Sequence, residues 1–455
     1  MLPIVRLLIQ TAGTIQTATA LEKPTILEPL WACTVEAGVE WCAPVGGEPA
    51  TALLICTKDA RLDLIDLKTG RSRLPDPIPV QPGMQFAGQT GNVAYGCGPS
   101  EVYAFRVETG VDSNVDKPGL LWQVAAAPKV ETEGDPEFLT RIIAANATRD
   151  GLLIVRSDGR VAELSRPNGS VRWRRRLPTF ANCTLHVRDA IAALLWKHGN
   201  AFSVAFFDLQ ADPVLPTVTT INDTLPIWTG LIDDGLVTVW PHRFGVLPTD
   251  GKPRFHKMHE GIDPTAATVA VYAPAVRPAG KPATTAPAAS GLLLLNSGYE
   301  FLCAYDLATG GLRWPEPGLL RTNWRFDSAQ ALWVSAEFVL CTGPAWFVVH
   351  CALSGDNLSA YHFPRGSTIG AGVNDGFWYA LSAENNTAAG RGGPRAMRLV
   401  RQIMTGVPWS RPNEPVTPEA REFLLGEAGP IRDTFWLGGT LVIVEEKRVR
   451  VYALP

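Results

Sequence analysis

The segment LCAYDLATGGLRWPEP, residues Leu302 to Pro317, carries the pattern that decides the fold. An apolar run ends at Asp306, a Thr-Gly turn follows, and Trp314 stands four residues after Gly310. A glycine in such a turn can adopt a positive φ, where a Cβ would clash, so the chain can reverse direction there. The segment therefore predicts a strand, a tight turn and an outer strand that carries a large apolar side chain.

The same spacing recurs along the chain. Three more segments share a glycine and a large apolar residue four positions later, namely Gly70 with Leu74, Gly169 with Trp173, and Gly251 with Phe255. Looser copies of the turn stand at Gly110, Asp212, Gly355 and Gly406, and a last unit ends with the chain. Together these segments make nine candidate units of one repeat.

Two short β segments precede each turn. The clearest pairs are 51–57 with 61–67, 152–158 with 160–164, 291–298 with 300–307, and 440–446 with 448–454. The second segment of each pair often alternates apolar with polar residues, as a half-buried strand does, and the connectors are short enough for hairpins. No long segment shows a helical period, although Pro418–Leu425 is compatible with a short helix.

Repeated four-stranded sheets predict an all-β fold, a β-propeller, in which the large apolar side chains fill the gaps between neighbouring sheets. A strand at Leu30–Val35, with Trp31, should complete the sheet of Thr440–Leu454 and close the ring, because open sheet edges invite aggregation. Propellers usually have about four to eight blades. We expect eight blades, with one degenerate unit, around 188–220 or 373–409, that is not a full blade, and nine blades as the alternative.

Composition limits the function classes. Net charge is −3, so no overall basic field favours nucleic acid or an anionic membrane, and 46 % apolar against 19 % charged residues suits a large core. No run approaches the roughly 18 apolar residues of a transmembrane helix. We expect one propeller domain over 28–455, preceded at 1–27 by an N-terminal arm or a weak signal-like segment.

The eight cysteines predict buried free thiols rather than a disulfide framework or a zinc site. They are Cys33, Cys42, Cys56, Cys97, Cys183, Cys303, Cys341 and Cys351. None forms C-x-x-C, and most lie in apolar runs. This usage slightly favours the cytoplasm, while the even count leaves an exported or periplasmic protein as the alternative.

The segment YDLATGGLRW, Tyr305 to Trp314, resembles the pyrroloquinoline-quinone-like (PQQ-like) repeat, and weaker copies extend the resemblance over roughly 28–455. That family includes quinoprotein dehydrogenases and non-enzymatic propellers such as the barrel-assembly lipoprotein of bacterial outer membranes. The dehydrogenases carry adjacent cysteines over the quinone, and no two cysteines are adjacent here. The lipoprotein carries a lipid-modified cysteine soon after its signal peptide, whereas Cys33, the first cysteine here, lacks a lipobox. The resemblance therefore implies the fold, and we assign no catalytic, cofactor-binding or metal-binding residue from it.

A histidine-rich segment is the first candidate for chemistry. His256 and His259, with Glu260 and Asp263, could bind zinc, but a third fixed ligand is missing and a polar loop is the favoured interpretation. Other weak signals have similar alternatives. The Asp233-Asp234 pair is typical of a turn, GRGGPR at 390–395 of a flexible loop, and the Ala/Pro-rich stretch at 277–290 of a surface insertion.

The segment RWRRR, Arg172 to Arg176, is the strongest local basic run. In a strand, alternation places Arg172, Arg174 and Arg176 on one face, opposite Trp173 and Arg175. The favoured role is a solvated edge that resists strand pairing, and a patch for an anion or an acidic partner is the alternative.

The sequence as a whole favours a non-catalytic scaffold that mediates protein–protein interaction within a larger complex. Loops on a rigid propeller would carry specificity, and the longest lie at 111–119, 128–140, 275–290 and 384–396. The alternatives are an enzyme that uses the central channel, quinone-dependent or hydrolytic, and a carbohydrate-binding propeller. We expect a protein partner and no cofactor.

Overall fold

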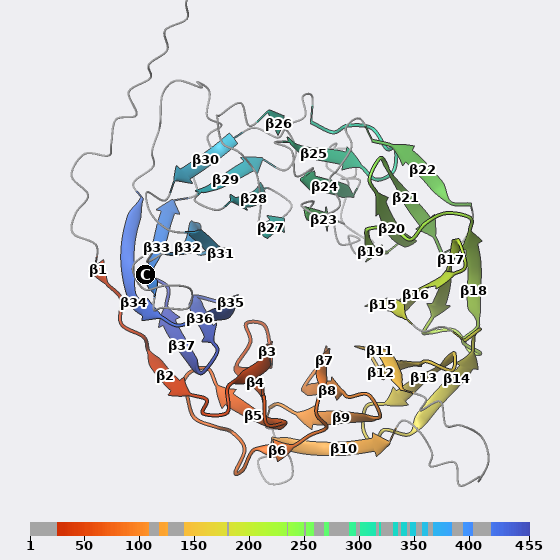
Figure 1. Cartoon of the computed structure of the whole chain (residues 1–455), viewed down its shortest axis with the longest axis horizontal. Helices are drawn as coiled ribbons and strands as arrows, with labels where there is room; N and C mark the ends of the chain where they lie inside the picture. The colour runs from red at the N-terminus through yellow and green to blue at the C-terminus, as the bar shows by residue number, and fades with distance from the viewer. Residues whose placement is uncertain are drawn as a thin grey trace, which may run out of the picture.

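The computed structural model describes residues 25–108, 118–125, 141–179, 182–233, 235–249, 252–258, 268–272, 291–296, 301–314, 318–319, 331–334, 338–343, 346–351, 357–362, 367–384, 395–403 and 420–455. Over these ranges the protein is all-β, and the strands form nine sheets arranged in a ring (Figure 1). The chain is therefore a β-propeller, as predicted. Among the described residues, no helix is long and apolar enough to span a membrane.

Each sheet is one blade, and its strands follow one another from the centre of the ring outward. Blade 1 consists of β3 (Val39–Val45), β4 (Ala52–Thr57), β5 (Arg61–Asp66) and β6 (Ile78–Pro79). Blade 2 consists of β7 (Gln85–Thr90), β8 (Val93–Cys97), β9 (Glu101–Arg106) and β10 (Gly119–Ala125). Blade 3 consists of β11 (Ile142–Ala147), β12 (Gly151–Arg156), β13 (Arg160–Ser165) and β14 (Val171–Arg176). Blade 4 consists of β15 (Cys183–Arg188), β16 (Ile191–His198), β17 (Ala201–Asp208) and β18 (Pro216–Ile221). Blade 5 consists of β19 (Trp228–Ile232), β20 (Gly235–Trp240), β21 (Arg243–Pro248) and β22 (Arg254–Lys257). Blade 6 consists of β23 (Thr268–Tyr272), β24 (Leu292–Asn296), β25 (Phe301–Asp306) and β26 (Gly318–Leu319). Blade 7 consists of β27 (Ala331–Val334), β28 (Phe338–Gly343), β29 (Trp346–Cys351) and β30 (Asn357–His362). Blade 8 contains β31 (Ser367–Asn374), β32 (Phe377–Ala383), β33 (Arg395–Ile403) and β34 (Arg421–Ala428). Blade 9 consists of β35 (Ile431–Leu437), β36 (Thr440–Glu445), β37 (Arg448–Ala453) and β2 (Trp31–Thr34).

The Thr-Gly turn after the third strand is built as the sequence predicts. The Asp66 carboxylate accepts hydrogen bonds from the backbone N–H of Thr69 (2.8 Å) and from its hydroxyl (3.0 Å), and the N–H of Gly70 donates to the Asp66 carbonyl (2.8 Å). Asp306 and Gly310 repeat this arrangement in blade 6. Both glycines have a φ of +71°, which L side chains rarely adopt.

The turn glycine also lies under a side chain of the preceding blade. At the turn of blade 3, Trp122 from β10 of blade 2 donates its Nε1–H to the Arg166 carbonyl at 2.8 Å. A Cβ on Gly169 would approach the Trp122 ring to 2.9 Å. The glycine is therefore required twice, by its φ of +69° and by the ring that covers it.

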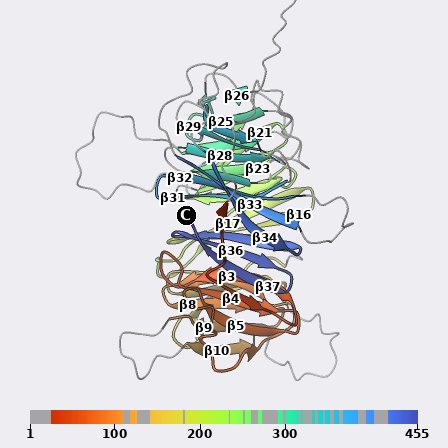
Figure 2. The ribbon, with the colours of Figure 1, turned by 90° about the vertical axis from the view of Figure 1, so that its left-hand side faces the viewer.

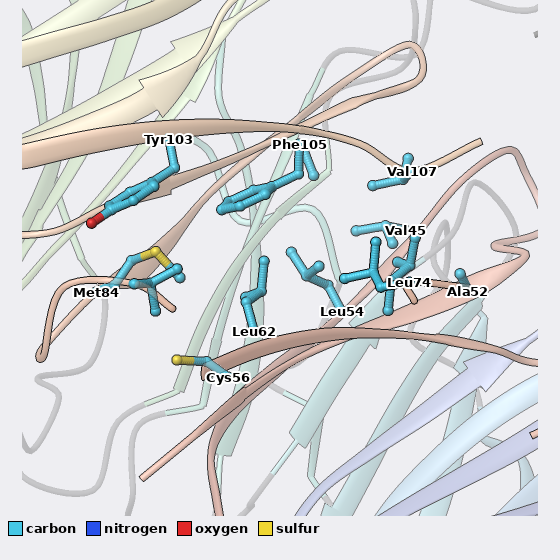
Figure 3. Packing of buried hydrophobic residues seen from close by; sticks show 13 residues of the cluster. Val45, Ala52, Leu54, Cys56, Leu62, Leu74, Met84, Tyr103, Phe105 and Val107 are labelled. Atoms are coloured by element: carbon cyan, nitrogen blue, oxygen red, sulfur yellow. The ribbon is translucent and has the colours of Figure 1, made fainter. Parts of the chain in front are cut away.

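The large apolar residue four positions after the glycine fills the gap between sheets in most of the described units. Leu74 belongs to the buried cluster between blades 1 and 2 (Figure 3). Trp173 stacks on Phe207 of blade 4 with ring centroids 5.9 Å apart. Trp314 is only 1 % exposed.

Phe255 departs from this rule, and its predicted role is wrong. It is 41 % exposed and lies over Gly245 and Trp240 of its own blade. In the register of β22, the next residue, His256, contacts Gly310 of blade 6 instead. A shift of one position along a strand exchanges the two faces, so the spacing alone places this ring on the wrong side.

Buried apolar clusters join the blades. Figure 3 shows one of them, in which Leu54 and Leu62 of blade 1 meet Tyr103 and Phe105 of blade 2. Similar clusters lie between blades 2 and 3, 3 and 4, 4 and 5, 5 and 6, 7 and 8, and 8 and 9. At about 25 cal/mol per Å² of buried apolar surface, these interfaces supply the main stabilising term of the fold.

The ring closes as predicted, with an N-terminal strand in the last blade. β2 pairs antiparallel with β37, in a register that places Trp31 opposite Val451 and Cys33 opposite Val449. Figure 2 shows β36 and β37 beside β3, β4 and β5, and a buried cluster joins blades 9 and 1. The strand predicted at Leu30–Val35 is confirmed, and it covers the edge of β37 that would otherwise be open.

Three details differ from the sequence predictions. The described residues form nine sheets, so eight is wrong and the alternative count is correct, because the described parts of the degenerate units at 188–220 and 373–409 belong to two sheets of at least four strands each, blades 4 and 8. The helix predicted at Pro418–Leu425 is also wrong, since Arg421–Ala428 is strand β34, paired along its length with β33. A short strand, β1 (Thr25–Ile26), adds in parallel to β34 and gives blade 8 five strands.

Candidate functional site

An open groove lies between blades 3 and 4. Its volume is about 660 Å³. Blade 3 contributes residues of the β11–β12 hairpin and of β14, and blade 4 contributes the turn between β17 and β18. The lining residues are Arg149, Asp150, Arg172, Trp173, Arg175, Leu209, Gln210, Ala211, Asp212, Pro213 and Val214. We call this feature the blade 3–4 groove.

The arginine run lies on strand β14, the outermost strand of blade 3. Arg172, Arg174 and Arg176 are exposed, whereas Trp173 and Arg175 are partly buried against blade 4. The predicted alternation is therefore confirmed. Because successive side chains of a strand point to opposite faces, one short run both packs a blade interface and presents a basic surface.

A buried carboxylate positions this strand. Glu163 on β13 is 1 % exposed and accepts hydrogen bonds from the Thr148 hydroxyl (2.6 Å), Arg172 Nη1 (2.9 Å) and Trp173 Nε1 (2.9 Å). A buried carboxylate with three donors is well compensated. Glu163 thus fixes two residues of the groove wall, a role that the sequence reasoning missed because their contact depends on the register of two strands.

The three arginines of the groove differ in how they are held. Arg172 also contacts Asp150 at 3.0 Å, so two carboxylates neutralise it. Arg175 donates its Nε–H to the Val214 carbonyl at 2.5 Å and an Nη1–H to the Arg174 carbonyl at 2.7 Å. Arg149 is exposed and has no hydrogen-bond or ion-pair partner among the described residues. Carbonyl contacts do not neutralise a guanidinium, and no carboxylate pairs with Arg149 or Arg175 among the described residues.

The arginines give the groove the chemistry of anion binding. Guanidinium groups bind carboxylates and phosphates through paired N–H donors. The lining includes no cysteine, serine, histidine or lysine, and its ionisable side chains are three arginines and the aspartates Asp150 and Asp212. Within the described ranges, no group of three or more potential metal-binding side chains occurs.

His256 packs between blades 5 and 6. It contacts Gly310 of blade 6, and its ring lies 5.1 Å from that of Phe244. Burial, with a smaller contribution from the positive charge of Arg254, lowers its pKa. The other three proposed ligands, His259, Glu260 and Asp263, lie outside the described residues.

The remaining candidates are structural or fall outside the described ranges. Asp233 forms an ion pair with Arg188 of blade 4 at 2.8 Å, and Asp234 is not among the described residues. The insertion at 277–290 and residues 390–394 lie outside them as well. Of the four long loops proposed for binding, only residues 118–119, 384 and 395–396 are described.

Five of the described cysteines are partly or fully buried thiols, in line with the prediction for them. Cys33, Cys42, Cys56, Cys97 and Cys183 form no disulfide. Burial raises the pKa of Cys42, Cys97 and Cys183 to about 12 and that of Cys56 to about 11. A thiol with such a pKa is almost wholly protonated at neutral pH and is a poor nucleophile.

Comparison with known proteins finds similarity in structure alone, since the sequence matches no family model and no curated protein. BamB from Moraxella catarrhalis is 12 % identical over 94 % of this chain and 100 % of its own, with a TM-score of 0.43. The WD40 domain of SCAP from fission yeast is 10 % identical over 94 % of this chain and 98 % of its own, with a TM-score of 0.46. Sqt1 from Saccharomyces cerevisiae is 9 % identical over 95 % of this chain and 100 % of its own, with a TM-score of 0.47. The assignment of this chain as a β-propeller rests on the nine sheets formed by its described residues.

Proposed function

We propose that this chain is a non-catalytic propeller scaffold that binds a protein partner within a larger complex, and that the blade 3–4 groove is a contact site. The observation that carries the proposal is the rigid presentation of charged arginines at an open groove. Arg175 is held by the backbone of the next blade, and buried Glu163 anchors the same strand. Arginine is enriched at protein interfaces, and pre-positioned side chains lose little entropy on binding.

Exposed apolar side chains near the groove support the same role. Val171 is 56 % exposed, Leu215 63 % and Val218 48 %. Val171 precedes Arg172, and Leu215 follows Val214 in the groove lining. An apolar surface beside a charged one is typical of an interface in which a buried centre is surrounded by polar contacts.

The proposal includes assignment of the repeat to the PQQ-like type in its non-enzymatic branch. The packing of Trp122 on the turn at Gly169 in the following blade supports this assignment. The tryptophan of one blade covers the turn glycine of the next, which explains why the motif needs both residues. The absence of adjacent cysteines from the sequence separates the chain from the quinone-dependent members that it resembles.

Affinity capture from the native cell tests the proposal. The full chain should recover a partner in fixed stoichiometry, and the Arg149→Gln variant should recover less of the same partner. Arg254→Gln, on the outer strand of blade 5, is the matched control and should recover the wild-type amount. Equal recovery by all three proteins would remove the groove from the proposal. Tight, calcium-dependent binding of added quinone, measured by absorbance and thermal shift, would replace the scaffold with an enzyme.

A further inference from the structure

The blade 3–4 groove offers unpaired positive charge in a protein whose net charge is −3. Arg172 is neutralised by Asp150 and Glu163, whereas no carboxylate contacts Arg149 or Arg175 among the described residues. Arg175 uses Nε and Nη1 in its backbone contacts, which leaves the Nη2 donors available. The groove therefore has two guanidinium groups that can pair with incoming anions.

The walls of the groove discriminate among anions. Asp150 is paired with Arg172, whereas Asp212 lines the groove beside the arginines, so a dense polyanion such as a nucleic-acid backbone would meet repulsion at Asp212. Separate carboxylates with apolar residues between them fit better, since Trp173 and Val214 are also in the lining. This pattern of charge favours a peptide with alternating acidic and apolar side chains.

The adjoining strand favours an extended peptide. β18 begins two residues after Val214, is the edge strand of blade 4, and has the uncharged sequence PTVTTI. Edge strands without charged residues are open to pairing with another strand, whereas the arginines of β14 discourage it. The chain itself shows that an outer strand accepts an addition, because β1 pairs with β34 as a fifth strand of blade 8.

We infer that the blade 3–4 groove binds an acidic, extended segment of a partner protein, whose carboxylates pair with Arg149 and Arg175 and whose backbone continues along β18. This inference rests on the proposed function and names the chemistry of its partner. Binding of this kind combines main-chain hydrogen bonds for affinity with side-chain contacts for specificity. Its electrostatic part should weaken as salt screens the exposed charges.

Fluorescence anisotropy with a labelled peptide of alternating Glu and Val tests the inference on the full chain. The peptide should bind, a Lys/Val peptide of equal length should not, and Arg149→Gln should weaken binding about tenfold, as expected for loss of one charge-assisted pair. Arg254→Gln should leave the affinity unchanged. Arg175→Lys keeps the charge but loses the fork geometry and the hydrogen bond to Val214, so it should weaken binding with only a small fall in melting temperature.

A pair of charge substitutions tests the part played by β18. Thr217 is exposed on that strand, so Thr217→Glu should weaken binding of the acidic peptide several-fold. Thr217→Lys should weaken it much less, because a lysine also hinders edge pairing but attracts the acidic peptide. A difference that depends on the sign of the charge at one exposed position cannot arise from a general loss of stability. Equal effects of the two, no binding of the acidic peptide, or tighter binding of single-stranded DNA would overturn the inference. If the partner is captured but the peptide does not bind, the inference fails and the scaffold stands; if the peptide binds but nothing is captured, the scaffold proposal fails.

Discussion

Trp31 lies over Gly70, and the contact joins the last blade to the first. The indole Nε1–H donates to the Leu67 carbonyl at 2.7 Å. A Cβ on Gly70 would lie 2.6 Å from Cδ2 of the ring. Trp31 belongs to β2, in the blade that the two ends of the chain build together, so this contact fastens the ring at its closure.

Substitution of Gly70 should cost more stability than its backbone conformation alone explains. In Gly70→Ala, a φ of +71° costs about 1–2 kcal/mol, and displacement of the Trp31 ring adds about 1–3 kcal/mol. Gly83→Ala is the matched control, because Gly83 has a φ of +77° and nothing within 4 Å of an added Cβ. Thermal unfolding should show a clearly larger loss for Gly70→Ala. Equal losses would mean that Trp31 does not press on the turn.

Two residues at the same repeat position should respond very differently to truncation. Trp314→Ala should lose about 3–5 kcal/mol, the range for removal of a buried aromatic ring, because Trp314 is 1 % exposed. Phe255→Ala should lose much less, since Phe255 is 41 % exposed. Denaturant midpoints of both variants measure the difference. A larger loss for Phe255→Ala would contradict the packing described for blades 5 and 6.

Loss of the buried carboxylate at Glu163 should release the basic strand. Glu163→Ala removes the acceptor of three hydrogen bonds and should destabilise the protein by about 2–4 kcal/mol, less than a fully buried ion pair because Arg172 is partly exposed. Asp150→Ala, which removes only the exposed partner of Arg172, should cost under about 1 kcal/mol. Similar losses in the two variants would show that Glu163 does not anchor β14.

Alkaline pH should destabilise the protein through its buried thiols. Burial raises the pKa of Cys97 from its ordinary value of 9.0 to about 12, so the folded state holds this proton more tightly than the unfolded state. The contribution of the Cys97 proton to the free energy of unfolding is therefore fully present below pH 9, and it is lost as the pH rises from there towards 12. Melting temperature should therefore fall above about pH 9, and less steeply in Cys97→Ala. If the melting temperature fell equally steeply with pH in the wild type and in Cys97→Ala, the burial of the Cys97 thiol would be contradicted.

The local features of the fold could be predicted from sequence because short-range chemistry determines them. The Asp-x-x-Thr-Gly turn, its positive φ and the hairpins before it need only neighbouring residues, and Gly70 and Gly310 confirm them. Closure by Leu30–Val35 was predictable because the last unit lacks one strand. The ninth blade was ambiguous, since blade 4 turns at Asp212 without the glycine that marks a repeat.

The candidate site was predictable only in part. Alternation placed the arginines of β14 on the correct faces. The other wall, from Leu209 to Val214, belongs to the next blade, and Arg149 comes from the β11–β12 hairpin, well before β14 in the chain. Glu163 gives no sequence signal either, because a carboxylate in an alternating strand looks like any exposed residue. Such contacts depend on how sheets pack, which a linear pattern does not specify.

The most direct test of the account is a cross-link at the closure of the ring. Cys33 on β2 stands opposite Val449 on β37, and both side chains contribute to the cluster between blades 9 and 1. Val449→Cys should form a disulfide with Cys33 under mild oxidation, and peptide mapping by mass spectrometry should show residues 33 and 449 linked within one chain. Val451→Cys, opposite Trp31, should not form that link. If Val449→Cys gives no link to Cys33, or links only between chains, the N-terminal strand does not close the propeller.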